Sequence, residues 1–375
     1  MDRIMDGVPV FIFGAGKIGR EYFSTINHFY NFVAFVDNDE DKQSRGYLGQ
    51  AVFHPQALTN YFDKRPLILI AASPQHQKEI ITQLGEMGFE YGRDVKGLFT
   101  FVTHELAEEV FRREEQVFNR LCQISLTERC SLKCKKCAHA CNLVPNTRKD
   151  LTLAQAISSA DHFFDIVDYS QEFVLIGGEP LLYKELDQII EYIGEKYREK
   201  INIFSITTNG TILPNEKILE NCKKYQVTFR ISNYSKSIPR LKEQYKKLME
   251  LLDKWDMKYL ISDEQVFWDY GFDWVDHHMD EAILKQTFEM CKTPCREVQE
   301  NRYYFCVMAH TVSNNMYDGK IGQGDYLNLD SLKGPEGRKA FFEFEQGQLK
   351  KGYLDMCNHC NGIESQKYVL PAGEQ

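Results

Sequence analysis

Apolar and polar positions along the first part of the chain predict alternating strands and helices. Residues 8–13 (VPVFIF) form a continuous apolar run of strand length, and an amphipathic helical pattern follows it. Further apolar runs cover residues 32–36 and 67–72, and a second helical pattern covers residues 75–87. This order predicts a small βαβαβ unit.

A glycine motif lies between the first predicted strand and the first predicted helix. It reads GAGKIG, with glycines at Gly14, Gly16 and Gly19, and the second predicted strand ends at Asp37. Such glycines let the backbone approach a pyrophosphate at a helix N-terminus, and the acidic residue can accept hydrogen bonds from a ribose. The pattern predicts a Rossmann-like domain over residues 1–100, which either binds a nucleotide or nucleotide-sugar or serves a structural or docking role.

The alternation resumes after a charged helical segment, residues 101–120, which we interpret as a linker. The alternation of strands and helices over residues 121–285 predicts a parallel sheet, and the length of this segment suits a partial (β/α)6 barrel. The predicted fold class is therefore α/β. The predicted strands are 122–127, 172–177, 201–207, 226–232 and 257–261, and the predicted helices are 152–166, 184–198, 214–224 and 236–253. Residues 286–375 break the pattern and predict a separate, cysteine-bearing module.

The amino-acid composition mainly excludes certain classes of protein. The chain has 375 residues, of which 43% are hydrophobic and 26% are charged, as expected of a globular protein with more than one domain. A net charge of −9 disfavours a nucleic-acid partner. No apolar run approaches the roughly 18 residues of a membrane span, and the first residues lack a signal-peptide pattern. We therefore expect a cytoplasmic protein with no nucleic-acid or membrane partner.

Cysteines are absent from the first domain and grouped in the rest of the chain. One group is Cys130, Cys134, Cys137 and Cys141, and the other is Cys291, Cys295, Cys306, Cys357 and Cys360. In a reducing compartment, such grouping indicates metal ions or iron–sulfur clusters rather than disulfides. The total of eleven also fits poorly with complete pairing.

The first three cysteines follow the first predicted barrel strand, at the end where barrel active sites lie. A closed zinc site needs four ligands, whereas three thiolates on a 4Fe–4S cube leave one iron open to an outside molecule. The next three predicted strands also end in polar motifs, which are GGEP at 177–180, TTNGT at 207–211 and SNY at 232–234. A barrel would bring these motifs together at one mouth.

The C-x3-C-x2-C spacing, together with GGEP and TTNGT, resembles the radical S-adenosylmethionine (SAM) superfamily. The resemblance implies that Cys130, Cys134 and Cys137 hold a 4Fe–4S cluster, at which SAM is cleaved to a 5′-deoxyadenosyl radical that abstracts hydrogen from a substrate. It also implies a set of SAM-binding residues, with Glu179 accepting a hydrogen bond from the amino group. This set is Gly177, Gly178, Glu179, Pro180, Thr208, Asn209 and Ser232.

Three residues of the first cysteine loop are open in role. Lys136 stands where many members of the superfamily carry an aromatic residue beside the adenine, so this contact would rest on backbone atoms. Cys141 is either a buried cysteine or a functional thiol. His139 is interpreted as a loop residue rather than a ligand, because the open iron is meant for the cofactor.

The second cysteine group resembles the twitch or SPASM-like auxiliary module of the same superfamily, with a hairpin predicted between Cys295 and Cys306. The resemblance implies a second 4Fe–4S cluster held by four thiolates, with structural zinc as the alternative. Cys306, Cys357 and Cys360 are expected ligands. Either Cys291 or Cys295 supplies the fourth thiolate.

The order of motifs over residues 120–362 resembles radical enzymes encoded among polysaccharide and glycan biosynthesis functions. This implies a carbohydrate or nucleotide-sugar substrate that undergoes oxidation, epimerisation or elimination, and an external electron donor such as flavodoxin or ferredoxin. Trp268, Asp269 and Tyr270 either line the substrate pocket or pack in the core. A peptide maturase and a non-enzymatic metal-binding scaffold are the competing hypotheses.

Overall fold

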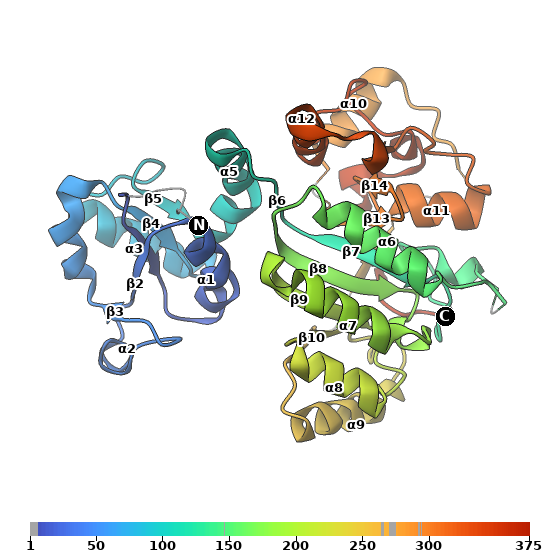
Figure 1. Cartoon of the computed structure of the whole chain (residues 1–375), viewed down its shortest axis with the longest axis horizontal. Coiled ribbons are helices and arrows are strands. Elements are labelled where there is room, and N and C mark those ends of the chain that lie inside the picture. Colours follow the sequence, from blue (N-terminus) through green and yellow to red (C-terminus); the bar gives the residue numbers. More distant parts are fainter. Residues whose placement is uncertain (1–6, 146, 264–265, 270–274, 292, 294) are drawn as a thin grey trace. The chain divides into compact units, whose positions relative to one another are not determined.

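The computed structural model describes residues 7–145, 147–263, 266–269, 275–291, 293 and 295–375. The chain divides into two compact units, Met1–Arg120 and Leu121–Gln375 (Figure 1). Among the described residues, no helix has the length and apolar character needed to cross a membrane.

The first unit is built on a five-stranded parallel sheet with the order β3-β2-β1-β4-β5. Its strands are β1 (Val10–Phe13), β2 (Phe32–Val36), β3 (Val52–Phe53), β4 (Leu67–Ile70) and β5 (Val95–Gly97). The helices between them are α1 (Lys17–Phe29), α2 (Glu40–Arg45), the 3-10 helix η1 (Pro55–Lys64) and α3 (Pro74–Glu86). The three longer strands lie where the apolar runs predict them, and the short strands β3 and β5 were not predicted.

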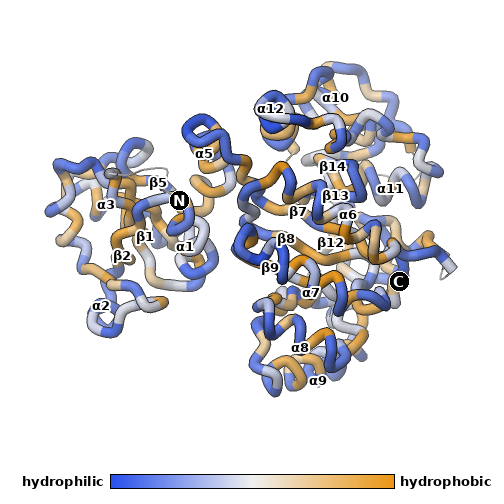
Figure 2. Tube along the Cα trace, viewed as in Figure 1, coloured by the Kyte–Doolittle hydropathy of each residue, from blue (hydrophilic) through white to orange (hydrophobic). Residues whose placement is uncertain are grey.

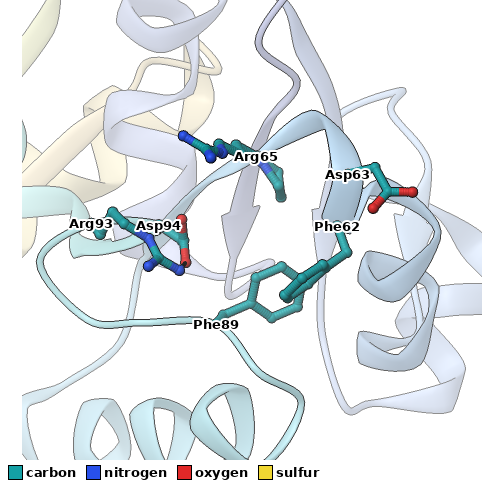
Figure 3. A pocket seen from close by; sticks show the side chains of 7 residues that line it. Phe62, Asp63, Arg65, Phe89, Arg93 and Asp94 are labelled. Carbon is teal, nitrogen blue, oxygen red and sulfur yellow. Dashed lines mark hydrogen bonds and ion pairs between the residues drawn. The ribbon is translucent and has the colours of Figure 1, made fainter.

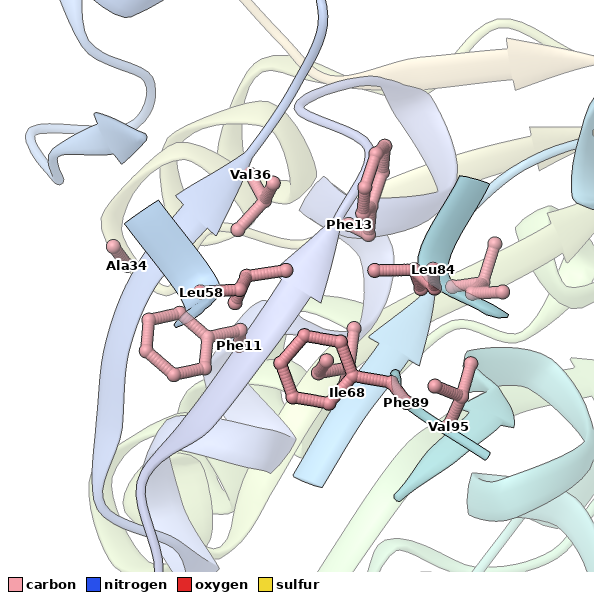
Figure 4. Close-up of a cluster of buried hydrophobic side chains, with 10 residues drawn as sticks. Phe11, Phe13, Ala34, Val36, Leu58, Ile68, Leu84, Phe89 and Val95 are labelled. Atoms are coloured by element: carbon pink, nitrogen blue, oxygen red, sulfur yellow. The ribbon is translucent and has the colours of Figure 1, made fainter. Parts of the chain in front are cut away.

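Alternate residues of the central strands form the core on one face of this sheet. Phe11 and Phe13 of β1 project to the same side as Leu58 of η1 and Leu84 of α3, and all four are nearly inaccessible to solvent (Figure 4). Figure 2 shows the same strands in the hydrophobic colour. Because β1 is buried on both faces, its residues are apolar throughout, which explains the continuous run in the sequence.

The segment expected to be a linker, residues 101–120, belongs to the first unit instead. It follows α4 (Leu98–Thr100) and contains a π-helical turn (Phe101–Glu105), α5 (Leu106–Glu114) and β6 (Phe118–Asn119). Phe101, Leu106 and Val110 are fully buried, and the Tyr30 hydroxyl donates to Glu109 Oε2 at 2.6 Å. The helical character of the segment was predicted, and a narrow apolar stripe among its many charges explains how the helix packs.

The second unit contains a sheet with the order β11-β10-β9-β8-β7-β13-β14-β15. Strands β7 (Cys122–Thr127), β8 (Tyr169–Gly177), β9 (Ile201–Thr208), β10 (Thr228–Ile231) and β11 (Tyr259–Ile261) are parallel neighbours in chain order. Helices α6 (Leu153–Phe164), α7 (Leu186–Tyr197), α8 (Glu216–Lys224) and α9 (Leu241–Lys254) connect them (Figure 1). All nine elements lie where the sequence predicts them, with ends shifted by a few residues.

Residues 286–375 were expected to form a separate module. Strands from this part of the chain instead extend the sheet, and it belongs to the same compact unit as the barrel strands. Strand β13 (Arg296–Gln299) pairs parallel to β7, and β14 (Arg302–Tyr304) forms the predicted hairpin with β13. The remaining elements are β12 (Val266–Trp268), α10 (Glu281–Glu289), α11 (Met308–Tyr317), β15 (Tyr326–Asn328), α12 (Gly334–Glu345) and β16 (Val369–Pro371). Aromatic rings of α6, β14 and α12 meet at Phe163, Tyr303 and Phe341, which joins the barrel helices to the C-terminal elements.

Gly194 provides a test of the packing between α7 and α8. A Cβ atom at Gly194 would lie 2.2 Å from Cγ of the Tyr225 ring, whereas a Cβ at Gly85 of α3 would meet nothing within 4 Å. We expect Gly194→Ala to lower the free energy of unfolding by about 1–3 kcal/mol through overpacking. Gly85→Ala should raise it by up to about 1 kcal/mol, since alanine favours helix. Denaturant unfolding of the two variants measures both changes.

Candidate functional site

The GGEP segment packs directly against the first cysteine loop at the C-terminal ends of β7 and β8. The Gly178 amide donates to the Thr127 carbonyl at 2.7 Å, and the Glu179 amide donates to the Arg129 carbonyl at 2.9 Å. A Cβ atom at Gly178 would lie 2.3 Å from the Arg129 oxygen and 2.9 Å from Cys130 Cβ. The approach of the two segments therefore requires glycine.

Glu179 connects the GGEP segment to the TTNGT segment. Its carboxylate is fully buried, and Oε1 accepts from Thr208 Oγ1 at 2.8 Å and from the Leu181 amide at 3.1 Å. Oε2 accepts from the Asn209 amide at 2.8 Å. Burial raises the pKa of Glu179 to about 7, and these hydrogen bonds only partly oppose the shift. A buried carboxylate held in this way favours a cationic or strongly donating partner.

Asn209 connects the TTNGT segment to the cysteine loop. Its Nδ2 atom donates to Cys130 Sγ at 3.5 Å and to Ser131 Oγ at 3.1 Å. The Ser131 and Thr211 hydroxyls also share a hydrogen bond of 2.6 Å. Three motifs that are far apart in the sequence are thus brought together around Cys130.

The fourth strand adds Ser232 and Tyr234 to the same region. The Ser232 amide donates to the Thr208 carbonyl at 2.9 Å. Tyr234 is partly buried, and desolvation raises the pKa of its hydroxyl, while a hydrogen bond with the Ser232 side chain opposes that shift. The charges of Cys134, Cys137 and Cys130 raise the pKa of Tyr234 further. Sequence reasoning named Ser232 but did not assign Tyr234 to the site.

Cys134 is buried, Cys130 and Cys137 are partly buried, and N–H groups donate to the sulfur atoms of Cys130 and Cys134. Burial raises the pKa of Cys130 and of Cys134 to about 11, and the charge of Cys137 adds to both shifts. Gln375 Nε2 donates to Cys134 Sγ at 3.4 Å, and the Leu132 amide donates to Cys130 Sγ at 3.5 Å. N–H donors to sulfur and soft thiolates suit an iron–sulfur cluster, which these residues therefore fit.

Cys141 acts on this group through Cys137. A hydrogen bond from the Cys141 thiol lowers the pKa of Cys137, and the same interaction raises the pKa of Cys141.

Within the described part of the chain, no group of three or more Cys, His, Asp or Glu residues is placed to hold a single metal ion.

Four cysteines of the second group influence one another. Desolvation raises the pKa of Cys306, and the charges of Cys291, Cys360 and Cys357 raise it further. Cys291 also raises the pKa of Cys357 and of Cys360, in both cases after the larger effect of desolvation. Cys295 and Cys306 are both partly buried and pack against the same apolar cluster. Cys291 thus influences the pKa of the three expected ligands Cys306, Cys357 and Cys360. It is one of the two cysteines that the sequence left open as the fourth ligand.

The predicted N-terminal site has a cavity beside it, but Asp37 is already engaged within the protein. Its Oδ2 atom accepts from the Ala15 amide at 2.9 Å and from Lys42 Nζ at 3.0 Å, and Oδ1 accepts from the Asp39 amide at 3.1 Å. Gly14 and Gly16 line the cavity of ≈ 530 Å³ together with Asp37. The carboxylate therefore holds the glycine loop in place and has little capacity left for a ribose.

At Gly14 and Gly19 the backbone packs too closely against neighbouring carbonyl oxygens for a larger residue to fit. Gly14 has φ +119°, and a Cβ atom there would lie 2.5 Å from the Ala71 carbonyl oxygen. A Cβ atom at Gly19 would lie 2.5 Å from the Gly14 oxygen. A Cβ atom at Gly16 would meet nothing within 4 Å, so among these three glycines only Gly16 faces open space.

A second hollow of the first unit contains no predicted site residue. It has a volume of ≈ 400 Å³, and Figure 3 shows Phe62 and Phe89 on one side and Arg93 with Asp94 on the other. The two rings lie 5.4 Å apart, and the hydrogen bond from Arg93 lowers the pKa of Asp94. The described contacts satisfy these groups within the protein.

The Trp268–Tyr270 segment is only partly described. Asp269 Oδ1 forms an ion pair with Lys136 Nζ at 3.3 Å, which places this segment beside the first cysteine loop. The Trp268 side chain and Tyr270 lie outside the described residues, so their predicted role stays a prediction. The His139 carbonyl accepts from Asn315 Nδ2 at 3.1 Å, and the interpretation of His139 as a loop residue stays a prediction.

Comparison with known families agrees with this geometry. Residues 124–252 match the radical SAM superfamily. The chain carries a radical SAM domain. The match covers the strands that bear the first cysteine loop, GGEP and TTNGT, and it identifies the protein as an enzyme. Residues 8–93 match a second family, described as C2185-like, N-terminal.

Curated relatives match a limited share of the chain. A GTP 3′,8-cyclase of Syntrophomonas wolfei is 35% identical over 95 residues, which are 24% of this chain and 27% of the relative. A probable GTP 3′,8-cyclase of Methanococcus maripaludis strain C5 is 33% identical over 147 residues, 38% of this chain and 42% of the relative. The chain thus spans less than half the length of these relatives.

Solved structures that align with part of this chain include two with S-adenosylmethionine bound. The crystal structure of BtrN in complex with AdoMet and 2-DOIA aligns with a TM-score of 0.42 at 18% identity, covering 68% of this chain and 100% of BtrN. Streptococcus suis SuiB bound to S-adenosylmethionine aligns with a TM-score of 0.31 at 19% identity, covering 50% of this chain and 44% of SuiB.

The raised pKa of Glu179 predicts a pH dependence for the iron-free protein. The pKa is about 7 in the folded state against an ordinary value of 4.5. Because a raised carboxyl pKa favours the folded state only while the group is protonated, its contribution is complete below pH 4.5 and is lost as the pH rises through 7. We expect wild type to lose about 3 kcal/mol more than Glu179→Gln between pH 4.5 and 8. Urea unfolding at several pH values measures the difference, and parallel profiles would contradict it.

Proposed function

We propose that this protein is a radical SAM enzyme that generates a 5′-deoxyadenosyl radical and abstracts a hydrogen atom from a carbohydrate or nucleotide-sugar. The observation that supports it most directly is the buried Glu179 carboxylate, which binds both Thr208 Oγ1 and the Asn209 amide beside Cys130. Only the folded sheet brings these residues together, and they combine soft cluster ligands with an acceptor for an amino group.

In this proposal each residue of the site has a stated task. Cys130, Cys134 and Cys137 hold a 4Fe–4S cluster, which supplies the electron for SAM cleavage when both are bound. Glu179 accepts from the SAM amino group, and Gly177, Gly178 and Pro180 set the backbone that carries it. Thr208, Asn209 and Ser232 provide the polar wall of the same pocket.

The second cysteine group is proposed to hold an auxiliary 4Fe–4S cluster in a twitch-like module. Cys291, Cys306, Cys357 and Cys360 are the proposed ligands, since the charge of Cys291 acts on each of the other three. Four thiolates would close the site, which suits electron transfer. The hairpin that ends before Cys306 ties this group to the barrel sheet.

The substrate class rests on the order of motifs and on the relatives. The order resembles radical enzymes of glycan biosynthesis, and the curated relatives are named for a nucleotide, GTP. The glycine loop is proposed to hold a nucleotide portion in the cavity that Gly14 and Gly16 line, with Gly19 and Asp37 holding the loop in place. A cytoplasmic flavodoxin or ferredoxin is the proposed electron donor.

Anaerobic reconstitution with iron and sulfide tests the proposal. After reduction in the presence of SAM, 5′-deoxyadenosine should form, and its rate should rise with a nucleotide-sugar but not with a peptide. Iron should reach about eight atoms per chain if both groups hold a 4Fe–4S cluster. A protein that never forms 5′-deoxyadenosine refutes the radical function, and stimulation by peptides alone favours a maturase.

A further inference from the structure

A cavity of ≈ 660 Å³ lies in the second unit, beside the first cysteine loop. Its walls come from the end of β7, the segment before α6, the β13–β14 hairpin and the first half of α11. The residues that the argument uses are Ser125, Glu128, Arg148, Gln299 and His310. A volume of this size is within the range of small-molecule sites.

Three residues that line the cavity each carry a buried polar atom that lacks a partner among the described residues. Ser125 Oγ, Glu128 Oε1 and Gln299 Oε1 are buried, and none of them hydrogen-bonds to another described residue. Ser125 is only 2% exposed. Because a buried polar atom without a partner costs about 1–3 kcal/mol, three such atoms at one cavity indicate that a ligand supplies donors.

Neighbouring contacts fix the orientation of these acceptors. Gln299 Nε2 donates to the Ser125 carbonyl at 3.2 Å, so turning the amide over would set two oxygens against each other. Glu128 Oε2 accepts from Arg148 at 2.7 Å, which leaves Oε1 as the oxygen without a partner. The donors must therefore come from whatever occupies the cavity.

The cavity shares its walls with the loop that carries the cluster ligands. Glu128 lies two residues before Cys130, and its charge acts on the Cys141 thiol, which hydrogen-bonds to Cys137. His310, which also lines the cavity, has Nδ1 2.8 Å from Glu297 Oε1, and Asn315 of the same helix donates to the His139 carbonyl. A ligand in the cavity is thus held next to the first cysteine loop.

We propose that this cavity binds the hydroxylated ring of the substrate, with ring hydroxyls donating to Glu128 Oε1, Gln299 Oε1 and Ser125 Oγ. The inference rests on the proposed function, whose substrate class it narrows to a polyol. Adjacent ring carbons of a sugar carry several hydroxyl donors in a fixed arrangement, which matches acceptors from three separate segments. A peptide presents its backbone donors in a linear series, which matches them less well.

Calorimetric titration of the reconstituted, SAM-bound enzyme with UDP-glucose, UDP-N-acetylglucosamine and methyl glucoside tests the cavity. At least one of these probes should bind wild type. Gln299→Leu and Ser125→Ala should each weaken binding about three- to tenfold, as expected for one lost hydrogen bond. Gln286→Leu, on the exposed surface of α10, is the matched control and should keep wild-type affinity.

The outcomes separate the cavity from the proposed function. If methyl glucoside binds, the ring alone is sufficient for binding in the cavity. If only the UDP-sugars bind, the proposal is still supported, provided that both variants weaken their binding. The proposal that the cavity binds the substrate ring is overturned if no probe binds. It is also overturned if both variants keep wild-type affinity and wild-type circular dichroism. Failure of wild type to form 5′-deoxyadenosine overturns the proposed function, even if a sugar binds.

Discussion

Cys130→Ala is expected to abolish 5′-deoxyadenosine formation and to lower the iron content by about four atoms per chain. Cys130 is the thiol that the TTNGT segment approaches, through Asn209 Nδ2, and that the GGEP segment packs against. A 4Fe–4S cluster with two protein thiolates in place of three would not be retained. Iron analysis and chromatographic detection of 5′-deoxyadenosine, both under anaerobic conditions, measure the result.

Cys222→Ala is the matched control for this experiment. Cys222 is a fully buried cysteine of α8 in the same unit but belongs to neither cysteine group. Its replacement should leave iron content and 5′-deoxyadenosine formation near wild type. If Cys130→Ala keeps both properties, the cluster that cleaves SAM is held by other residues.

Glu179→Gln is expected to weaken SAM binding by about 10- to 100-fold, the usual cost of a hydrogen bond to a charged group. The substitution keeps the shape of the side chain and replaces one acceptor oxygen with a donor. Since Glu179 is fully buried and held by Thr208 and Asn209, solvent cannot compensate for the lost acceptor. Equilibrium binding of SAM to the reconstituted protein measures the change.

Glu220→Gln provides the comparison, because Glu220 is exposed on α8. It should bind SAM as wild type does. An unchanged SAM affinity in Glu179→Gln, with the cluster intact, would show that the buried carboxylate has a structural role and does not contact the cofactor.

Much of the second unit could be predicted because its signals are local. Each of the strands β7 to β10 ends in a polar motif, and parallel strands place their C-terminal ends at one edge. The meeting of Cys130, Glu179 and Asn209 follows from that rule alone. The hairpin between Cys295 and Cys306 was predicted for the same reason, since its two strands are neighbours in the sequence.

The features that were missed depend on contacts between distant residues. The pairing of β13 with β7 joins Arg296 to Cys122, which are far apart in the chain and carry no shared pattern. The burial of Leu106 and Val110 within a highly charged segment is decided by the surface that they meet. Likewise, no sequence motif marks Ser125 or Gln299, whose relevance depends on acceptors left without donors.

The pairing of β13 with β7 also has a consequence for self-association. As the first strand of its parallel series, β7 would otherwise present unpaired backbone N–H and C=O groups, which are a template for pairing with a second molecule. Arg296 and Glu297 cover that edge by pairing with Cys122 and Gln123. A chain shortened after residue 285 would lose this cover, so the fragment should aggregate through its open edge even if every cluster and cofactor contact of the barrel were intact.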